Sequence, residues 1–103
     1  MITGKTRLLA VIGAPIGHSL SPMIQNAALR AAGLDYVYVA LPASPYALDS
    51  VVYGLRDAGV VGFNVTIPFK TEMIHLMNDL SDDARHVQAV NTVVIQRDSR
   101  LVG

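Results

Sequence analysis

The sequence contains no cysteine and no tryptophan, and its charges balance. Without cysteine the chain forms neither disulfide bonds nor thiolate metal sites, and this absence fits a protein of the reducing cytoplasm. Eight basic and eight acidic residues give a formal net charge of zero, so no basic surface for nucleic acid or an anionic membrane is indicated. The three histidines, His18, His75 and His86, lack the spacing of metal ligands, and we expect no bound metal.

The sequence also lacks a hydrophobic run long enough to span a membrane. Lys5 and Arg7 precede an apolar stretch, as in a signal peptide, but Gly13 and Pro15 interrupt that stretch and no cleavage pattern follows. It is about ten residues long, whereas a bilayer needs about twenty. We interpret it as a strand buried on both faces. The hydrophobic fraction of 51% is high for 103 residues, which suggests that a second domain or subunit covers part of the surface.

Strand-like and helix-like segments alternate along the chain. Five β-prone stretches predict strands, at residues 7–13, 35–41, 61–65, 91–97 and 100–102. Helical patterns cover residues 21–33, 44–59 and 68–77, and a further helix is expected after a cap at Ser81. This alternation predicts an α/β fold, a three-layer α-β-α sandwich with a mostly parallel sheet, formed by a single domain over residues 1–103.

The first two expected helices share the same boundary signals. A serine cap, a proline at the first helical position and a terminal glycine recur as Ser21, Pro22 and Gly33, and as Ser44, Pro45 and Gly59. Apolar side chains at helical spacing predict the faces that pack on the sheet: Ile24, Ala27, Ala28 and Ala31 in the first helix, and Leu48, Val51, Val52, Leu55 and Ala58 in the second. The tyrosines are expected to be packing residues: Tyr36, Tyr38, Tyr46 and Tyr53.

The loop after the first strand, GAPIGHSLSP, is not a phosphate-binding loop. The spacing of Gly13 and Gly17 is one residue too short, and His18 stands where such a loop has lysine. No G-x-G-x-x-G motif occurs, so the chain carries no dinucleotide fingerprint. Ser19 and Ser21 have two interpretations: a loop hydroxyl and a helix cap, or two hydroxyls that bind an anion where a parallel strand meets a helix N-terminus.

The segment NVTIPFK has the same geometry at the end of the third expected strand. Asn64 and Thr66 point to one face of that strand, and Lys70 falls in the first turn of the helix expected after Pro68. The positive end of the helix dipole and partial burial both lower the pKa of a lysine, which suits proton transfer. The alternative is a solvated lysine in a poorly capped helix. Asn91, taken alone, is typical of a turn before a strand.

These motifs together resemble a known family. GAPIGHSLSP, NVTIPFK and AVNTVV, in this order and spacing, are similar to the N-terminal, substrate-binding domain of shikimate dehydrogenase. The resemblance covers essentially the whole chain from Leu8 to Gly103. It implies the NADP-dependent reduction of 3-dehydroshikimate to shikimate in aromatic amino acid biosynthesis.

The resemblance also implies a role for each matching residue. Ser19 and Ser21 would hold the shikimate carboxylate, with Thr66 assisting. Lys70 and Asn91 would hydrogen-bond the ring hydroxyls, and Lys70 would also transfer the proton at the C3 oxygen. A further substrate-binding position, which would shape the same pocket, is Asn64.

The family pattern continues beyond the residues of this chain. In the family, an aspartate that partners the lysine and the domain that binds NADP follow the position of Gly103, so the resemblance implies that this chain binds no cofactor and is inactive in hydride transfer by itself. A second hypothesis is a non-catalytic shikimate-binding or self-associating module, which forms a homodimer through an exposed apolar face. A third is a Ser–Lys hydrolase using Ser19 or Ser21 with Lys70, although the chain has no nucleophile elbow.

Overall fold

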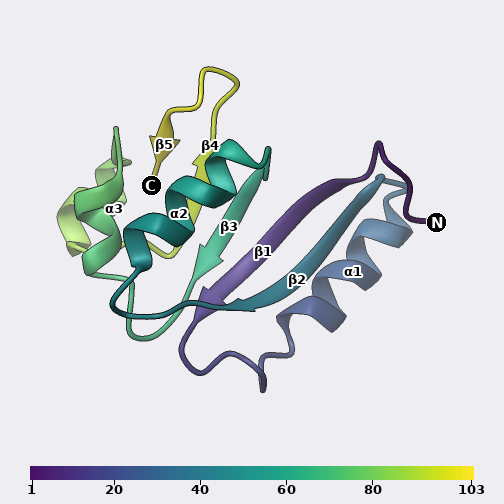
Figure 1. The fold of residues 1–103 in the computed structure, drawn as a ribbon, viewed down its shortest axis with the longest axis horizontal. Coiled ribbons are helices and arrows are strands. Elements are labelled where there is room, and N and C mark those ends of the chain that lie inside the picture. The colour runs from purple at the N-terminus through teal and green to yellow at the C-terminus, as the bar shows by residue number, and fades with distance from the viewer.

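Five strands form one mixed sheet in the computed structural model, which describes all residues from Met1 to Gly103 (Figure 1). The strands lie in the order β2-β1-β3-β4-β5. Their bounds are β1 Arg7–Gly13, β2 Tyr36–Pro42, β3 Gly62–Val65, β4 Thr92–Ile95 and β5 Leu101–Val102. β1 pairs in parallel with β2 and β3, whereas β4 and β5 add to the sheet as an antiparallel hairpin. The predicted α/β class and all five predicted strands are confirmed.

Helices lie on both faces of this sheet. Their bounds are α1 Ser21–Ala31, α2 Leu48–Asp57, the short 3₁₀ helix η1 Glu72–Leu76 and α3 Asp82–Val87. In Figure 1, α1 lies beside β1 and β2 on the right, and α2 and α3 lie at the other side of the molecule. Alternate residues of β1 serve the two faces, because Ala10 and Ile12 pack with α2 while Leu9 and Val11 pack on the α1 side.

The main hydrophobic core lies on the α2 face of the sheet. Leu48 and Val52 of α2 meet Met73 of η1 and the strands there, as the stripe of the second helix predicts. Ala58, the last residue of the predicted stripe, follows the helix and is exposed instead. Its largest fully buried side chains are Phe69, Ile12, Met73, Leu101, Val52, Val90 and Val93. Burial of each such side chain stabilises the fold by about 1.5–3 kcal/mol.

The predicted inner face of α1 is wrong. Ile24 is 62% exposed, and no residue of α1 is buried. The side of α1 that meets the sheet carries Asn26 and Leu29 instead. The Asn26 amide accepts from the Tyr38 backbone N–H at 2.9 Å and donates to the Tyr38 carbonyl at 2.7 Å, so a polar contact with the edge strand β2 sets the helix orientation. The residues of the predicted inner face are therefore exposed, whereas Leu29 packs against the sheet.

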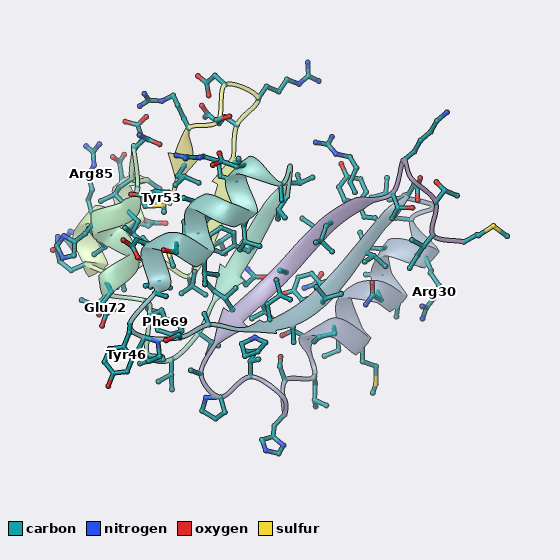
Figure 2. The ribbon with its side chains drawn as sticks, viewed as in Figure 1. Arg30, Tyr46, Tyr53, Phe69, Glu72 and Arg85 are labelled. Atoms are coloured by element: carbon teal, nitrogen blue, oxygen red, sulfur yellow. The ribbon has the colours of Figure 1, made fainter.

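Both predicted serine caps are also wrong. Ser21 lies inside α1, one position after the cap residue Leu20, and the cap has no side-chain hydrogen bond. α2 begins at Leu48 because Ser44 is part of a preceding turn, in which its Oγ accepts from the Tyr46 N–H at 3.2 Å. Tyr46 is 99% exposed and projects outward in Figure 2, so it is not a packing residue.

The glycine stops and the third cap are confirmed. Gly33 and Gly59 follow the first two helices with φ of +68° and +83°, the left-handed conformation that ends a helix. Ser81 caps α3, where its Oγ accepts from the Ala84 N–H at 3.1 Å.

No helix begins at Pro68. Residues 66–71 form turns, with the Phe69 N–H donating to the Thr66 carbonyl at 3.0 Å, and η1 starts only at Glu72. The Ile67–Pro68 peptide bond is cis, as is Ala14–Pro15. Lys70 therefore precedes the helical segment, and the expected contact with a helix dipole is absent. None of the four helical segments has both the length and the apolar character needed to cross a membrane.

Candidate functional site

The predicted site residues lie at one edge of the sheet. The strands β1 and β3 are parallel neighbours, so the loops after Gly13 and after Val65 leave the sheet at the same edge. β4 runs in the opposite direction and begins at this edge, where Thr92 pairs with Asn64. In open α/β sheets this is the edge at which ligands bind.

A cavity of about 300 Å³ lies between the two loops and the start of α1. Its lining residues are Val11, Pro15, Ile16, His18, Ser19, Ser21 and Thr66. The Ser19 Oγ accepts from the Ser21 N–H at 3.2 Å, which fixes the two hydroxyl-bearing residues relative to each other. The structure therefore brings Ser19, Ser21 and Thr66 together, and we name this space the serine cavity.

Backbone hydrogen bonds hold the two loops of the serine cavity against each other. The Thr66 N–H donates to the Ile12 carbonyl at 3.0 Å, and the Ala14 N–H donates to the Ile67 carbonyl at 3.2 Å. Each bond joins the end of β1 to the segment that follows β3. The position of the Thr66 side chain is thus set by the sheet rather than by a free loop.

A second cavity of about 340 Å³ contains Lys70 and Asn91, and we name it the lysine cavity. It is lined by Lys70, Ser81, Asp83, Ala84, Val87, Ala89, Val90, Asn91, Thr92 and Gly103. The Lys70 carbonyl accepts from the Val90 N–H at 2.8 Å, and the neighbouring Phe69 is fully buried. The backbone of Lys70 is therefore anchored, while its ammonium group is exposed and forms no ion pair.

Asn64 is hydrogen-bonded to side chains of β2 and β4. Its Oδ1 accepts from the Tyr38 hydroxyl at 2.6 Å, and its Nδ2 donates to Thr92 Oγ1 at 3.0 Å. Asn64 and Thr92 line a third cavity of about 220 Å³, and Thr92 also lines the lysine cavity. Val11, the neighbour of Asn64 on β1, lines the serine cavity. The six predicted residues thus line three cavities rather than a single pocket.

Two residues of this network were absent from the predicted site. Tyr38 was expected only to pack, yet its hydroxyl bonds Asn64 across the intervening strand β1. Burial raises the pKa of Tyr38 above its ordinary value of 10.0, so the hydroxyl keeps its proton as a donor. Thr92 stood in the quoted AVNTVV motif beside Asn91, but only the strand register shows that it faces Asn64.

The site contains no evident place for a metal or a dinucleotide. No group of three or more histidine, cysteine or carboxylate side chains lies close enough together to hold a metal ion. The loop that leads into α1 has none of the glycine-rich backbone that approaches a pyrophosphate, and Pro22 removes one of the N–H groups at the start of that helix. The polar groups present suit a small ligand with a carboxylate and hydroxyls.

Comparison with known proteins agrees with this geometry. Residues 11–93 match the family model described as the shikimate dehydrogenase substrate binding domain. The chain belongs to this family. The shikimate dehydrogenase (NADP⁺) of Geobacter metallireducens is 56% identical over 102 residues, which cover 99% of this chain and 35% of that protein. The resemblance seen in the sequence motifs is confirmed.

Solved structures of the family share the fold. The shikimate dehydrogenase of Aquifex aeolicus matches 100% of this chain with a TM-score of 0.97 and 44% identity. Shikimate 5-dehydrogenase of Listeria monocytogenes, solved in complex with shikimate and NAD, matches 99% of this chain with a TM-score of 0.95 and 45% identity. These matches cover 38% and 35% of the two solved chains, so this chain spans about a third of the length of its relatives.

Proposed function

We propose that the chain is the substrate-binding domain of a cytoplasmic, NADP-dependent shikimate dehydrogenase, which reduces 3-dehydroshikimate to shikimate in aromatic amino acid biosynthesis. Residues 1–103 form one domain in this proposal. The observation that carries it is the gathering of Ser19, Ser21 and Thr66 around one cavity, with Lys70 and Asn91 together in a second cavity. Family membership and the shikimate bound in the Listeria structure support the same ligand.

The serine cavity is the proposed carboxylate subsite. The Ser19 and Ser21 hydroxyls and the Thr66 hydroxyl are the donors that line it. Hydrogen bonds from neutral donors to a carboxylate are charge-assisted and contribute about 1.5–3 kcal/mol each.

The lysine cavity is the proposed subsite for the ring hydroxyls. Lys70, Asn91 and Thr92 line it together, and Asn64 donates a hydrogen bond to Thr92. Lys70 donates a proton to the C3 oxygen during reduction and accepts it in the reverse direction. An exposed ammonium with an anchored backbone suits this role, since the side chain is free to reach the oxygen while its origin stays fixed.

The residues of this chain do not fit the nicotinamide cofactor. The chain has no dinucleotide fingerprint, and the start of α1 has serine and proline where a glycine turn is needed. We therefore assign NADP binding to polypeptide outside these residues. The part of the reaction that belongs to this chain is to bind and orient the substrate and to move the proton at C3.

Two experiments test the proposal. Titration of the ¹⁵N-labelled chain with shikimate is expected to shift the backbone amide signals of Ser19, Thr66 and Lys70, and an unchanged spectrum at millimolar shikimate would overturn it. A chimera that joins residues 1–103 to the remaining two thirds of the Geobacter metallireducens relative is expected to oxidise NADPH when 3-dehydroshikimate is added. The 103-residue chain alone is expected to show no turnover.

The chimera also tests the role of Lys70. Lys70→Ala is expected to lower kcat about a hundred- to ten-thousand-fold, the usual contribution of a general acid. Lys5→Ala is the matched control, because Lys5 is an exposed lysine in the N-terminal turn, before β1 begins. Equal activity of the two variants would show that Lys70 takes no part in the reaction.

Self-association is a second candidate function, favoured by the outward face of α1. Leu20, Met23 and Ile24 are each more than 60% exposed at the start of that helix. An apolar helix face in water is typical of an interaction surface, and we propose that a second copy of the chain covers it to form a homodimer. Light scattering is expected to show a dimer that Met23→Glu dissociates. A monomer at every concentration would contradict this candidate and leave the substrate site unaffected.

A further inference from the structure

A chain of hydrogen bonds crosses the α1 face of the sheet beside the proposed substrate site. It starts at the Tyr38 hydroxyl on β2, passes over β1 to the amide of Asn64 on β3, and ends at the Thr92 hydroxyl on β4. The Tyr38 ring packs with Val11 of β1 on its way across. Three strands are thus joined by side chains on the face that α1 leaves open over β3 and β4.

Because Tyr38 is buried, its hydroxyl donates to the Asn64 oxygen, and this fixes the direction of the other hydrogen bonds in the chain. Tyr38 is 4% exposed, and Asn64 is the only hydrogen-bond partner of its hydroxyl. If the Asn64 amide were turned over, its NH₂ group would face the hydroxyl, and the tyrosine proton would have no acceptor in a buried place. An unpaired buried donor costs about 1–3 kcal/mol. Thr92 does not restrict the orientation of the Asn64 amide, because Thr92 is exposed and its hydroxyl can donate to water.

The fixed direction decides what Asn64 and Thr92 offer to a ligand. The Asn64 oxygen is turned to Tyr38, so one N–H of its NH₂ group bonds Thr92 and the other is left over. Thr92 Oγ1 accepts that bond and keeps its own proton to donate. Asn64 and Thr92 both line the cavity of about 220 Å³, and Thr92 also lines the lysine cavity.

We propose that Tyr38 is a positioning residue of the substrate site, which locks the Asn64 amide so that Asn64 and Thr92 present hydrogen-bond donors to an acceptor oxygen of the ligand. The identity of that ligand as shikimate or 3-dehydroshikimate rests on the proposed function. The site then selects an oxygen with a free lone pair at this position and disfavours an ammonium or other pure donor.

The position of Tyr38 is itself fixed by α1. Asn26 bonds the backbone N–H and carbonyl of Tyr38, and its Nδ2 also donates to the Pro22 carbonyl at 2.7 Å. The backbone that carries the tyrosine is therefore tied to the helix that starts at the serine cavity. A shift of α1 moves both the carboxylate subsite and the Asn64 amide.

The test compares Tyr38→Phe with Tyr36→Phe in the 103-residue chain. Tyr36 is the matched control, a half-buried tyrosine on the same strand whose ring instead lies 6.0 Å from the Arg7 guanidinium. The dissociation constant for shikimate, measured by titration calorimetry, is expected to rise about ten-fold in Tyr38→Phe and to stay unchanged in Tyr36→Phe. Equal affinity of Tyr38→Phe and the unaltered chain would overturn the proposal.

A double-mutant cycle separates positioning from a general structural effect. In an Asn64→Ala background, Tyr38→Phe is expected to cause no further loss of affinity, because the amide on which Tyr38 acts is gone. A ten-fold loss that persists in this background shows that Tyr38 acts through the fold and contradicts the proposal.

A ligand-free measurement keeps the test independent of the proposed function. In the ¹⁵N spectrum of the chain without ligand, the side-chain NH₂ signals of Asn64 are expected to shift and broaden in Tyr38→Phe as the amide samples both orientations. Unchanged signals would overturn the positioning role. Failure of the unaltered chain to bind shikimate, together with changed Asn64 signals, would remove the proposed ligand but leave the role of Tyr38 intact.

Discussion

The side chain of Thr66 occupies the space that a Cβ atom on Gly13 would need. The same Cβ would lie 3.1 Å from Ile16 Cδ1 and 3.2 Å from the Ile67 carbonyl oxygen. Only a glycine at the end of β1 lets the segment after β3 approach so closely, and this approach makes Thr66 part of the lining of the serine cavity. The geometry of the proposed carboxylate subsite therefore depends on the absence of a side chain at Gly13.

Gly13→Ala is expected to displace Thr66 and Ile16 and to destabilise the fold by about 1–3 kcal/mol, the usual cost of an overpacked site. Affinity for shikimate falls at the same time, because the displaced Thr66 lines the carboxylate subsite. Gly17→Ala is the control in the same loop, since nothing lies within 4 Å of its added Cβ. Urea denaturation and calorimetry measure the two effects, and equal stability of the two variants would contradict this reading of the packing.

Ser19→Ala is expected to lower shikimate affinity about ten-fold, through loss of one charge-assisted hydrogen bond to the carboxylate. The methyl ester of shikimate has no carboxylate charge, so its weaker binding is expected to change little in the same variant. Ser44→Ala serves as control, because the Ser44 Oγ accepts from the Tyr46 N–H in the turn between β2 and α2, and Ser44 does not line the serine cavity. Calorimetric titration with both ligands checks the comparison. An equal loss for acid and ester places Ser19 away from the carboxylate.

Local rules were sufficient for the strands and for several helix ends. The first strand was predicted at residues 7–13 and lies at Arg7–Gly13, because a continuous apolar run that stops at glycine fits only a buried strand. Gly33 and Gly59 adopt the left-handed conformation that their place in the sequence indicated. Alternation along β3 predicted that Asn64 and Thr66 share a face of the strand. Thr66 lines the serine cavity beside the β1 loop, whereas Asn64 bonds Tyr38 and Thr92.

Tertiary contacts determine the features that local sequence patterns did not predict. The apolar side of α1 was expected to face the sheet, yet Asn26 binds the edge of β2 and turns Ile24 outward. Helical spacing shows that a face is apolar but not which partner covers it. Lys70 was expected in a helix, and the turns at residues 66–71 place it before one. The role proposed for Tyr38 depends on its hydrogen bond to Asn64 across β1, which the spacing of residues within β2 does not reveal.

Ser81→Ala is expected to destabilise the fold by about 1 kcal/mol through loss of the cap of α3. The Ser81 Oγ accepts from the Ala84 N–H at 3.1 Å, and Ala84 is part of the main core. Ser50→Ala, at an exposed position of α2, is the control and is expected to be neutral or slightly stabilising. Thermal unfolding measures both variants. Because Ser81 also lines the lysine cavity, a loss of shikimate affinity without a loss of stability would indicate a contact with the ligand instead.

The stability of the chain is expected to fall at alkaline pH in part through Tyr38. Burial raises the pKa of this hydroxyl above its ordinary value of 10.0, so between the two values the unfolded chain has lost the proton that the folded chain keeps. Its contribution to the free energy of unfolding is therefore complete below about pH 10 and is lost as the pH rises through the folded-state pKa.

Tyr38→Phe removes this titration, and its free energy of unfolding is expected to decline less between pH 9 and pH 11 than that of the unaltered chain, by urea denaturation at about these two values. Tyr46→Phe is the control, because Tyr46 is 99% exposed. An identical alkaline decline in all three proteins means that the Tyr38 hydroxyl is solvated in the folded chain. The hydroxyl proton then has water as an acceptor, and nothing forces the Asn64 oxygen to face it.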